Sequence, residues 1–256
     1  MPGGPAVPGP EARTDLQSQG GATIVGRMYY RLGKTLLKPL THALYRPTIT
    51  GTEHVPRSGG VILASNHLSF IDSFAIPLTA PRRVRFLAKD DYFTGPGPGG
   101  AIRRGLFQAM GAIPINRRSS RAAQESLDAA LSVLQAGDAF GIYPEGTRSR
   151  DGRLYRGRTG VAFLALTARV PIVPVALEGT ADIMPIGSRF PRLARVSVAF
   201  GEPIAVAGHY AGMPQGRARR ELTDEVMAAI AALSGQERAD VFNELPPEAR
   251  GPAIGT

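Results

Sequence analysis

The stretch VILASNHLSFID, residues 61–72, joins a short apolar run to a histidine and an aspartate that stand five positions apart. The apolar run is typical of a buried strand, and Ser65 and Asn66 are residue types that favour the start of a helix. We therefore expect a helix from about Ser69, with His67 at the carboxyl end of the strand. Open α/β sheets place their sites at this end of their strands.

His67 and Asp72 form the first candidate site. In one regular α-helix, five residues turn the chain by about 500°, so these two side chains can meet only across a turn. The expected strand-to-helix turn provides one. Asp72 can then bind one imidazole nitrogen and leave the other as a base near neutral pH. The alternative is a histidine at a helix N-terminus with an aspartate that the helix dipole favours.

A second candidate site is the turn YPEGTRS, residues 143–149. Gly146 permits positive φ or the close approach of a ligand, and the planar guanidinium of Arg148 suits phosphate oxygens. Glu145 can orient that guanidinium or a neighbouring donor. The alternative is a turn with a surface ion pair, which contributes little stability.

A further cation, Arg117, ends the run at 111–117, which we expect to be a short apolar strand. Arg117 can reach the same phosphate, or it can form a solvated pair with Arg118. The segment GPGPGG at 95–100 has the spacing of a dinucleotide-binding loop, but its two prolines lack the N–H donors that a pyrophosphate needs. We expect a flexible loop there.

Composition limits the possible functions. The 256 residues carry 30 Lys+Arg against 21 Asp+Glu, a formal net charge of +9, which favours anionic partners such as lipid headgroups, nucleic acid or phosphate-bearing substrates. No nucleic-acid-binding motif accompanies the charge. The chain has no cysteine, which excludes a thiolate nucleophile and Cys-ligated zinc. No apolar run reaches the roughly 18 residues that a membrane span needs.

Strand-like and helix-like segments alternate from residue 49, which indicates an α/β fold with a partly parallel sheet. The expected strands lie at 61–64, 84–88, 139–143, 172–176 and 196–200, and the expected helices at 119–135, 159–169 and 217–233. We divide the chain into a disordered N-terminus (1–21), an amphipathic helical segment (22–46), one folded domain (47–234) and a flexible tail (235–256).

The segment at 23–45 has a helical period with two distinct faces. The apolar face holds Val25, Met28, Tyr29, Leu32 and Leu36, and the opposite face holds Arg27, Arg31, Lys34 and Lys38. Pro39 should kink or end the first helix, so that 40–45 forms a second. Two interpretations stay open: a surface helix packed on the core, or an interfacial helix whose basic face meets anionic headgroups.

Taken together, four blocks of sequence resemble the glycerophospholipid acyltransferase superfamily, and most of all its bacterial 1-acylglycerol-3-phosphate acyltransferases. The blocks, in family order, are Asn66-His67 with Asp72, the run 111–117, the turn 144–148 and Val173-Pro174-Val175. The resemblance extends over residues 45–205. It implies a single domain with a mixed sheet flanked by helices, its site blocks at one edge and its N-terminal helical pair on the membrane.

The resemblance also implies an activity. An acyl thioester, either acyl-CoA or an acyl carrier protein, would give its fatty acyl group to the free hydroxyl of 1-acylglycerol-3-phosphate, and phosphatidic acid would form. His67 would be the base and Asp72 its partner, without a metal or other cofactor. The residues that would bind the acceptor's phosphate are Arg117, Glu145, Gly146, Thr147 and Arg148. The enzyme would be peripheral, on the cytoplasmic face of the membrane.

Two departures from the family pattern leave other acceptors open. Pro114 stands where an aromatic is usual and Asn116 where an acid is usual, and the segment 95–100 is longer than the usual linker, as a lid or a tolerated insertion. One alternative is therefore an acyltransferase for another lysolipid or an aminolipid. A non-catalytic lipid-binding module is a further alternative, against which the intact His67 and Asp72 argue.

Overall fold

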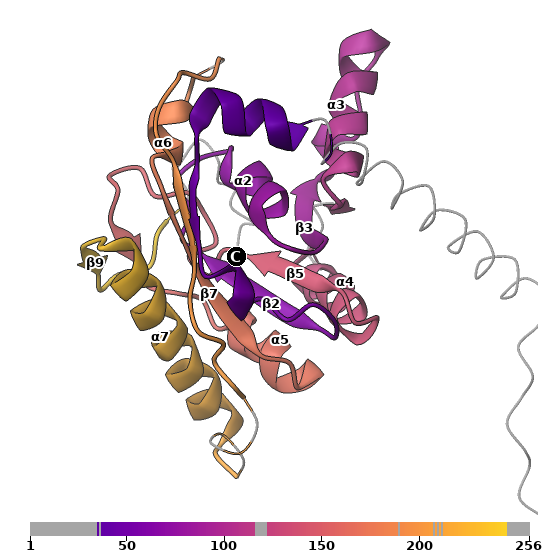
Figure 1. Ribbon diagram of the computed structural model, residues 1–256. Coiled ribbons are helices and arrows are strands. Elements are labelled where there is room, and N and C mark those ends of the chain that lie inside the picture. The colour runs from indigo at the N-terminus through magenta and orange to yellow at the C-terminus, as the bar shows by residue number, and fades with distance from the viewer. Residues whose placement is uncertain are drawn as a thin grey trace, which may run out of the picture.

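The computed structural model describes residue 35 and residues 37–115, 122–188, 190–206, 208, 210 and 212–244. One mixed sheet of seven strands forms its centre, in the order β1-β8-β7-β2-β5-β3-β4 (Figure 1). The strands are β1 (Thr48–Thr50), β2 (Val61–Ser65), β3 (Val84–Lys89), β4 (Ala112–Ile115), β5 (Ala139–Ile142), β7 (Ile172–Glu178) and β8 (Ser197–Phe200). Neighbouring strands are parallel except β7 and β8, which are antiparallel. Two short strands, β6 (Leu154–Tyr155) and β9 (Arg238–Ala239), pair separately.

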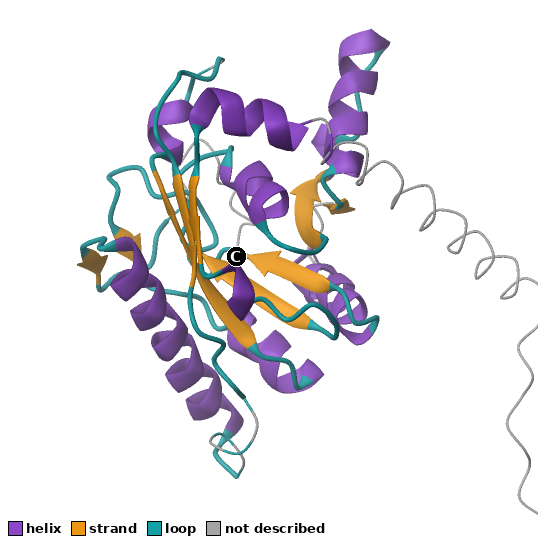
Figure 2. Ribbon diagram, in the orientation of Figure 1, coloured by secondary structure: helices purple, strands orange, loops and turns teal. Residues whose placement is uncertain are grey.

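Helices cover both faces of the sheet (Figure 2). They are α2 (Asp72–Thr79), α3 (Gly97–Ala109), α4 (Ala122–Gln135), α5 (Gly160–Ala168), α6 (Thr180–Ile183) and α7 (Gln215–Ser234), with 3₁₀ turns η1 (Thr52–His54) and η2 (Asp90–Tyr92). Apolar residues of α4, α5 and α7 pack on one face. Apolar residues of α2 pack on the other. The α/β fold, its single domain and its mixed sheet are thus as predicted.

Strand β2 lies at the centre of the core and carries His67 beyond its carboxyl end. All five of its residues are buried. Val61 and Leu63 face the α2 side, whereas Ile62 and Ala64 face α4, α5 and α7. A strand covered on both faces needs apolar residues at every position rather than at alternate ones, because neither face meets water. This explains the continuous apolar run in the sequence.

The expected loop at 95–100 is wrong, because α3 begins at Gly97. A proline in the first turn of a helix loses no intrahelical hydrogen bond, since the first N–H groups have no partner there in any case. Pro98 therefore does not prevent the helix. The residues that could have predicted α3 lie near its end, where Phe107 and Met110 are buried.

Two other expectations also need correction. Residues 37–45 form a helix that continues through Pro39, so the helix does not end at this residue. The flexible tail does not begin at Gly235, because β9 pairs with β6 and Asn243 is buried. Residues 1–34 and 245–256 lie outside the described residues, and the remaining domain boundaries stay predictions. No helix in the described part of the chain is long and apolar enough to cross a membrane.

Candidate active site

The two predicted site segments meet because the strands that carry them are neighbours. β2 pairs with β5 in parallel, with Ala64 opposite Ile142. His67 and Glu145 each lie three residues beyond this pair, at the same edge of the sheet. The backbone N–H of His67 donates to Oε1 of Glu145 at 3.0 Å, and the N–H of Ser149 donates to the carbonyl of His67 at 2.7 Å.

Asp72 reaches back to His67, as predicted. Nδ1 of His67 lies 2.8 Å from Oδ2 of Asp72, which also accepts the backbone N–H groups of Leu68 at 2.7 Å and Ser69 at 2.8 Å. Asp72 is fully buried. A carboxylate can only accept, so it holds the proton on Nδ1 and leaves Nε2 as the basic nitrogen. The geometry favours a base over the alternative of a helix-terminal pair.

The sequence analysis missed Tyr143, which fixes the plane of the imidazole. Its ring stacks on His67 with centroids 3.8 Å apart and an interplanar angle of 8°, and Phe86 stacks on the other side of Tyr143 at 5.6 Å. Desolvation, and then the nearby charge of Asp72, raise the pKa of Tyr143, so the phenol stays neutral. The only available signal was an aromatic residue directly before the Pro-Glu-Gly turn.

Glu145 hydrogen-bonds to the backbone around the site and does not orient Arg148. Its side chain is fully buried, and its two oxygens accept the N–H groups of His67 and Tyr155, each at 3.0 Å. Burial raises the pKa of Glu145 from 4.5 to about 7, against the opposing effect of these two hydrogen bonds. Both oxygens are occupied, so the carboxylate joins the His67 segment to β6 and does not contact an acceptor phosphate.

Three other residues predicted for the site, Gly146, Thr147 and Arg148, are at least partly exposed. Gly146 has φ of 79°, in the left-handed region that glycine permits. Arg148 makes no ion pair within the described residues. Arg117 lies outside the described residues.

Asn66 has a different role from the helix cap that the sequence suggested. It is fully buried, and its side-chain amide exchanges hydrogen bonds with the backbone of Leu177, at 2.8 Å and 2.9 Å. The same amide donates to Gln236 at 2.7 Å. Asn66 therefore ties the end of β2 to β7 and to the segment after α7. Sequence reasoning could not find this role, because the partners lie more than a hundred residues away.

A cavity of about 550 Å³ opens at His67. Its polar lining consists of His67, Ser73, Lys89, Ser126, Thr147 and Arg148, and Gly146 also borders it. Its walls are mainly apolar and include Phe70, Phe86, Tyr92, Phe107, Leu127 and Leu164. Of the predicted residues that the structure describes, four line this cavity and two, Asp72 and Glu145, lie behind it. Such a cavity suits a molecule with an anionic group and a long apolar chain.

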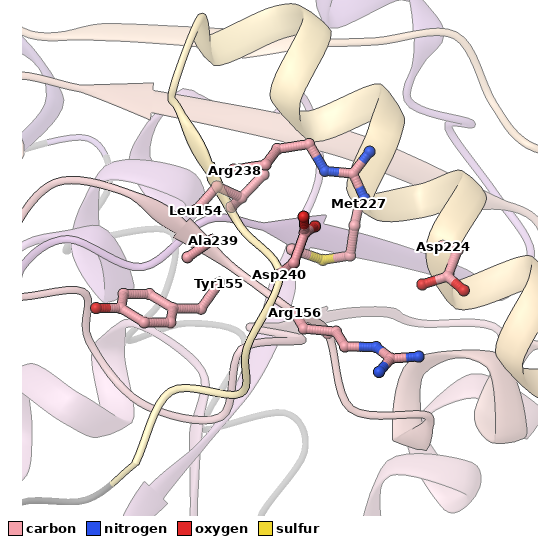
Figure 3. Close-up of a pocket in the computed structure, with 9 residues that line it drawn as sticks. Leu154, Tyr155, Arg156, Asp224, Met227, Arg238, Ala239 and Asp240 are labelled. Carbon is pink, nitrogen blue, oxygen red and sulfur yellow. The ribbon is translucent and has the colours of Figure 1, made fainter.

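A second cavity, of about 270 Å³, lies between β6, α7 and β9 (Figure 3). Arg156 and Arg238 line it together with Asp224 and Asp240. The charges balance, and neither His67 nor Arg148 contributes to it, so we do not assign the chemistry to this cavity. Among the described residues, no three His, Cys, Asp or Glu side chains gather as a metal site would require.

Comparisons with known proteins agree with this geometry. A chloroplastic 1-acyl-sn-glycerol-3-phosphate acyltransferase of Brassica napus is 34% identical over 148 residues, which cover 57% of this chain and 41% of that protein. A 1-acyl-sn-glycerol-3-phosphate acyltransferase of Borreliella burgdorferi is 33% identical over 132 residues, 52% of this chain and 51% of that protein. The chain thus spans about half or less of the length of these relatives.

The fold is also that of a solved protein. The crystal structure of the 1-acyl-sn-glycerophosphate acyltransferase PlsC from Thermotoga maritima matches with a TM-score of 0.60 and 23% identity, over 84% of this chain and 82% of that one. A family model described as Acyltransferase matches residues 46–178, which is more than half of the chain. The chain therefore belongs to the acyltransferase family.

Proposed function

We propose that the chain transfers a fatty acyl group from an acyl thioester, acyl-CoA or an acyl carrier protein, to the free hydroxyl of 1-acylglycerol-3-phosphate. The observation that supports this most is one cavity that is lined by His67, whose imidazole contacts Asp72, by Arg148, which makes no ion pair with a described residue, and by apolar side chains. Relatives named as acyltransferases for this acceptor support it further. The product would be phosphatidic acid.

The reaction follows from the site. Nε2 of His67 takes the proton of the acceptor hydroxyl, and the oxygen attacks the thioester carbonyl. Asp72 stabilises the imidazolium that forms, as the buried carboxylate does in a serine hydrolase triad. When the tetrahedral intermediate collapses, the carbon–sulfur bond breaks, and His67 returns the proton to the leaving thiolate. No acyl-enzyme is required, because the acceptor oxygen itself is the nucleophile.

The acceptor is tested by mass spectrometry of the products after incubation with mixed acyl-CoAs and a panel of lysolipids and aminolipids. Phosphatidic acid as the main product supports the proposal. If another lysolipid or an aminolipid is acylated preferentially, the proposed acceptor is wrong, but the proposed type of reaction is right. Lipid binding without any acylated product would mean a non-catalytic lipid-binding module.

Arg148→Ala should raise the KM for lysophosphatidate about 10- to 150-fold and leave the KM for acyl-CoA nearly unchanged. The reason is that a hydrogen bond to a charged group contributes about 1.5–3 kcal/mol, and Arg148 lines the cavity without an acidic partner. Steady-state kinetics with each substrate varied in turn measures both constants. Arg150→Ala is the matched control, because Arg150 is an exposed arginine two residues away that does not line the cavity. Equal effects on both substrates would contradict the assignment.

We also propose that the enzyme is peripheral and that residues 23–45 dock it on anionic membranes. Leu40 and Leu44, four residues apart on the described part of this segment, are 54% and 50% exposed and leave an apolar face uncovered. Reversing Arg31 and Lys34 to glutamate should weaken binding to anionic vesicles, because each basic residue near such a surface contributes about 1 kcal/mol. Co-sedimentation at low and high salt is the measurement. If neither salt nor these substitutions change vesicle binding, the alternative interpretation, a surface helix packed on the core, is favoured.

A further inference from the structure

The segment between α6 and β8, residues 184–196, exposes large apolar side chains that nothing in the described chain covers. Phe190 is 79% exposed, Leu193 73% and Ile186 39%. The segment MPIGSRFPRLARV also holds three arginines and no acid. Exposed apolar residues interleaved with cations are typical of a protein surface that enters the headgroup region of an anionic bilayer.

Hydrogen bonds hold this segment in its outward position. The N–H of Arg192 donates to the carbonyl of Ile183 at 2.7 Å, which closes the base of the loop. At the tip, the hydroxyl of Ser188 donates to the carbonyl of Phe190 at 2.9 Å. These two hydrogen bonds support the backbone in the conformation in which Phe190 and Leu193 are exposed.

The segment is tied directly to the active site. The hydroxyl of Ser69 donates to the carbonyl of Met184 at 2.7 Å, and the backbone N–H of Ser69 binds the Asp72 carboxylate that orients His67. A membrane that binds residues 184–196 would therefore also fix the position of the turn between His67 and Asp72 relative to the membrane surface. This is a useful property for an enzyme whose acceptor is a membrane lipid.

Other exposed apolar residues lie at the same end of the molecule. In Figure 1 the segment, the helix at 37–45 and α3 all reach the upper end. Among the large apolar residues that the structure describes as exposed, all but Val241 and Phe242 belong to these three segments. A peptide covers a single segment, whereas a lipid surface is broad enough to contact more than one.

Charge complementarity points to the same partner. Arg192 and Arg195 are exposed, and neither makes an ion pair with a described residue. We infer that the segment 184–196 is a second membrane-docking element, distinct from the N-terminal helix, which inserts Phe190 and Leu193 among anionic lipids and sets the depth of the His67 site. The inference rests on the proposed function in taking a membrane lipid as the acceptor.

The test compares binding of the full-length chain to sedimented vesicles of phosphatidylcholine with and without phosphatidylglycerol. The double variant Phe190→Ser with Leu193→Ser should lower the partition coefficient about tenfold or more, because two large apolar side chains no longer leave water. Val241→Ser is the matched control, since Val241 is a 61% exposed aliphatic residue outside the three segments. It should change binding by less than about twofold on the same scale.

A second pair of variants tests the charge. Arg192→Glu with Arg195→Glu should lower the preference for phosphatidylglycerol about tenfold or more, because the N-terminal segment keeps its own basic residues, and high salt should weaken the preference of the unaltered protein. Arg57→Glu is the control. Arg57 is exposed and precedes β2, whereas His67 follows the other end of that strand, so its reversal should leave the preference in place.

Activity assays on two forms of the acceptor distinguish a defect in membrane docking from a defect in catalysis. With lysophosphatidate embedded in vesicles, both double variants should lose activity in proportion to binding, whereas activity on detergent-dispersed acceptor should stay within about twofold. Unchanged vesicle binding, an equal loss of activity in detergent, or a dimer that the variants dissociate would each overturn the inference. If the unaltered protein binds vesicles as described but acylates neither form of the acceptor, the proposed function fails and the docking surface stands.

Discussion

Replacing His67 by alanine should lower kcat by about 10²–10⁴-fold, the usual contribution of a general base, while the protein still folds. His67 lines the cavity, and its Nδ1 lies 2.8 Å from Oδ2 of Asp72, which leaves Nε2 as the basic nitrogen. Acyl transfer measured in single turnovers, with circular dichroism to confirm folding, gives the result. The KM values should change much less than kcat.

His67→Gln is a second variant, because alanine also removes the packing of His67 on Tyr143, whereas glutamine keeps most of the side-chain volume. His54→Ala is the matched control. The His54 imidazole contacts the carbonyl of Phe200 at 2.9 Å and Glu202 at 3.0 Å, so its loss should affect stability modestly and kcat hardly at all. A folded His67→Gln or His67→Ala enzyme with nearly full turnover would remove the proposed mechanism.

Replacing Glu145 by alanine should lower the free energy of unfolding by about 2–6 kcal/mol. The carboxylate accepts the N–H groups of His67 and Tyr155, and each buried donor left without a partner costs about 1–3 kcal/mol. Activity should fall as well, because the His67 backbone loses its support. Denaturant unfolding and kinetics on the same samples measure both effects.

Glu145 should also make stability depend on pH. Its pKa is about 7 in the folded protein, with Asp72 and Asp151 adding to the effect of burial, and 4.5 is its usual value. The folded state therefore binds more protons than the unfolded state between these values, so stability falls as the pH rises from 4.5 to 7, by up to about 3 kcal/mol. Glu145→Gln should remove this part of the pH dependence.

The control for this experiment is Glu178→Gln, because Glu178 is an exposed carboxylate whose side chain accepts a hydrogen bond from the hydroxyl of Ser197. Its substitution should leave the slope of unfolding free energy against pH as it is. A Glu145→Gln protein with the same slope as the unaltered protein would show that this carboxyl does not titrate in the folded state near neutral pH.

Local patterns in the sequence were sufficient for most elements of the fold. The central strand β2 was recognisable because a strand with both faces covered must be apolar throughout. The helix α4 ends at Gln135, where the expected helix at 119–135 also ends. The helix α3 was missed, because glycines and prolines at its start outweighed the apolar residues near its end.

Part of the site was also readable. His67 and Asp72 interact across five residues, and Gly146 needs a conformation that glycine adopts easily, so both features depend on neighbours in the chain. The roles of Glu145 and Asn66 were not readable. Their partners are the N–H of His67 and the backbone of Leu177, which lie far away in the sequence.

The sequence by itself determined the apolar strands, the turn between His67 and Asp72 and the exit at Gly146, because each follows from side-chain periodicity and backbone freedom within a few residues. The tertiary structure alone decided that β2 lies beside β5 with Ala64 opposite Ile142. That register brings Glu145 and Tyr143 to His67. Burial of apolar faces drives such pairing, and it is non-directional, so many pairings of the same strands would satisfy the local pattern equally well.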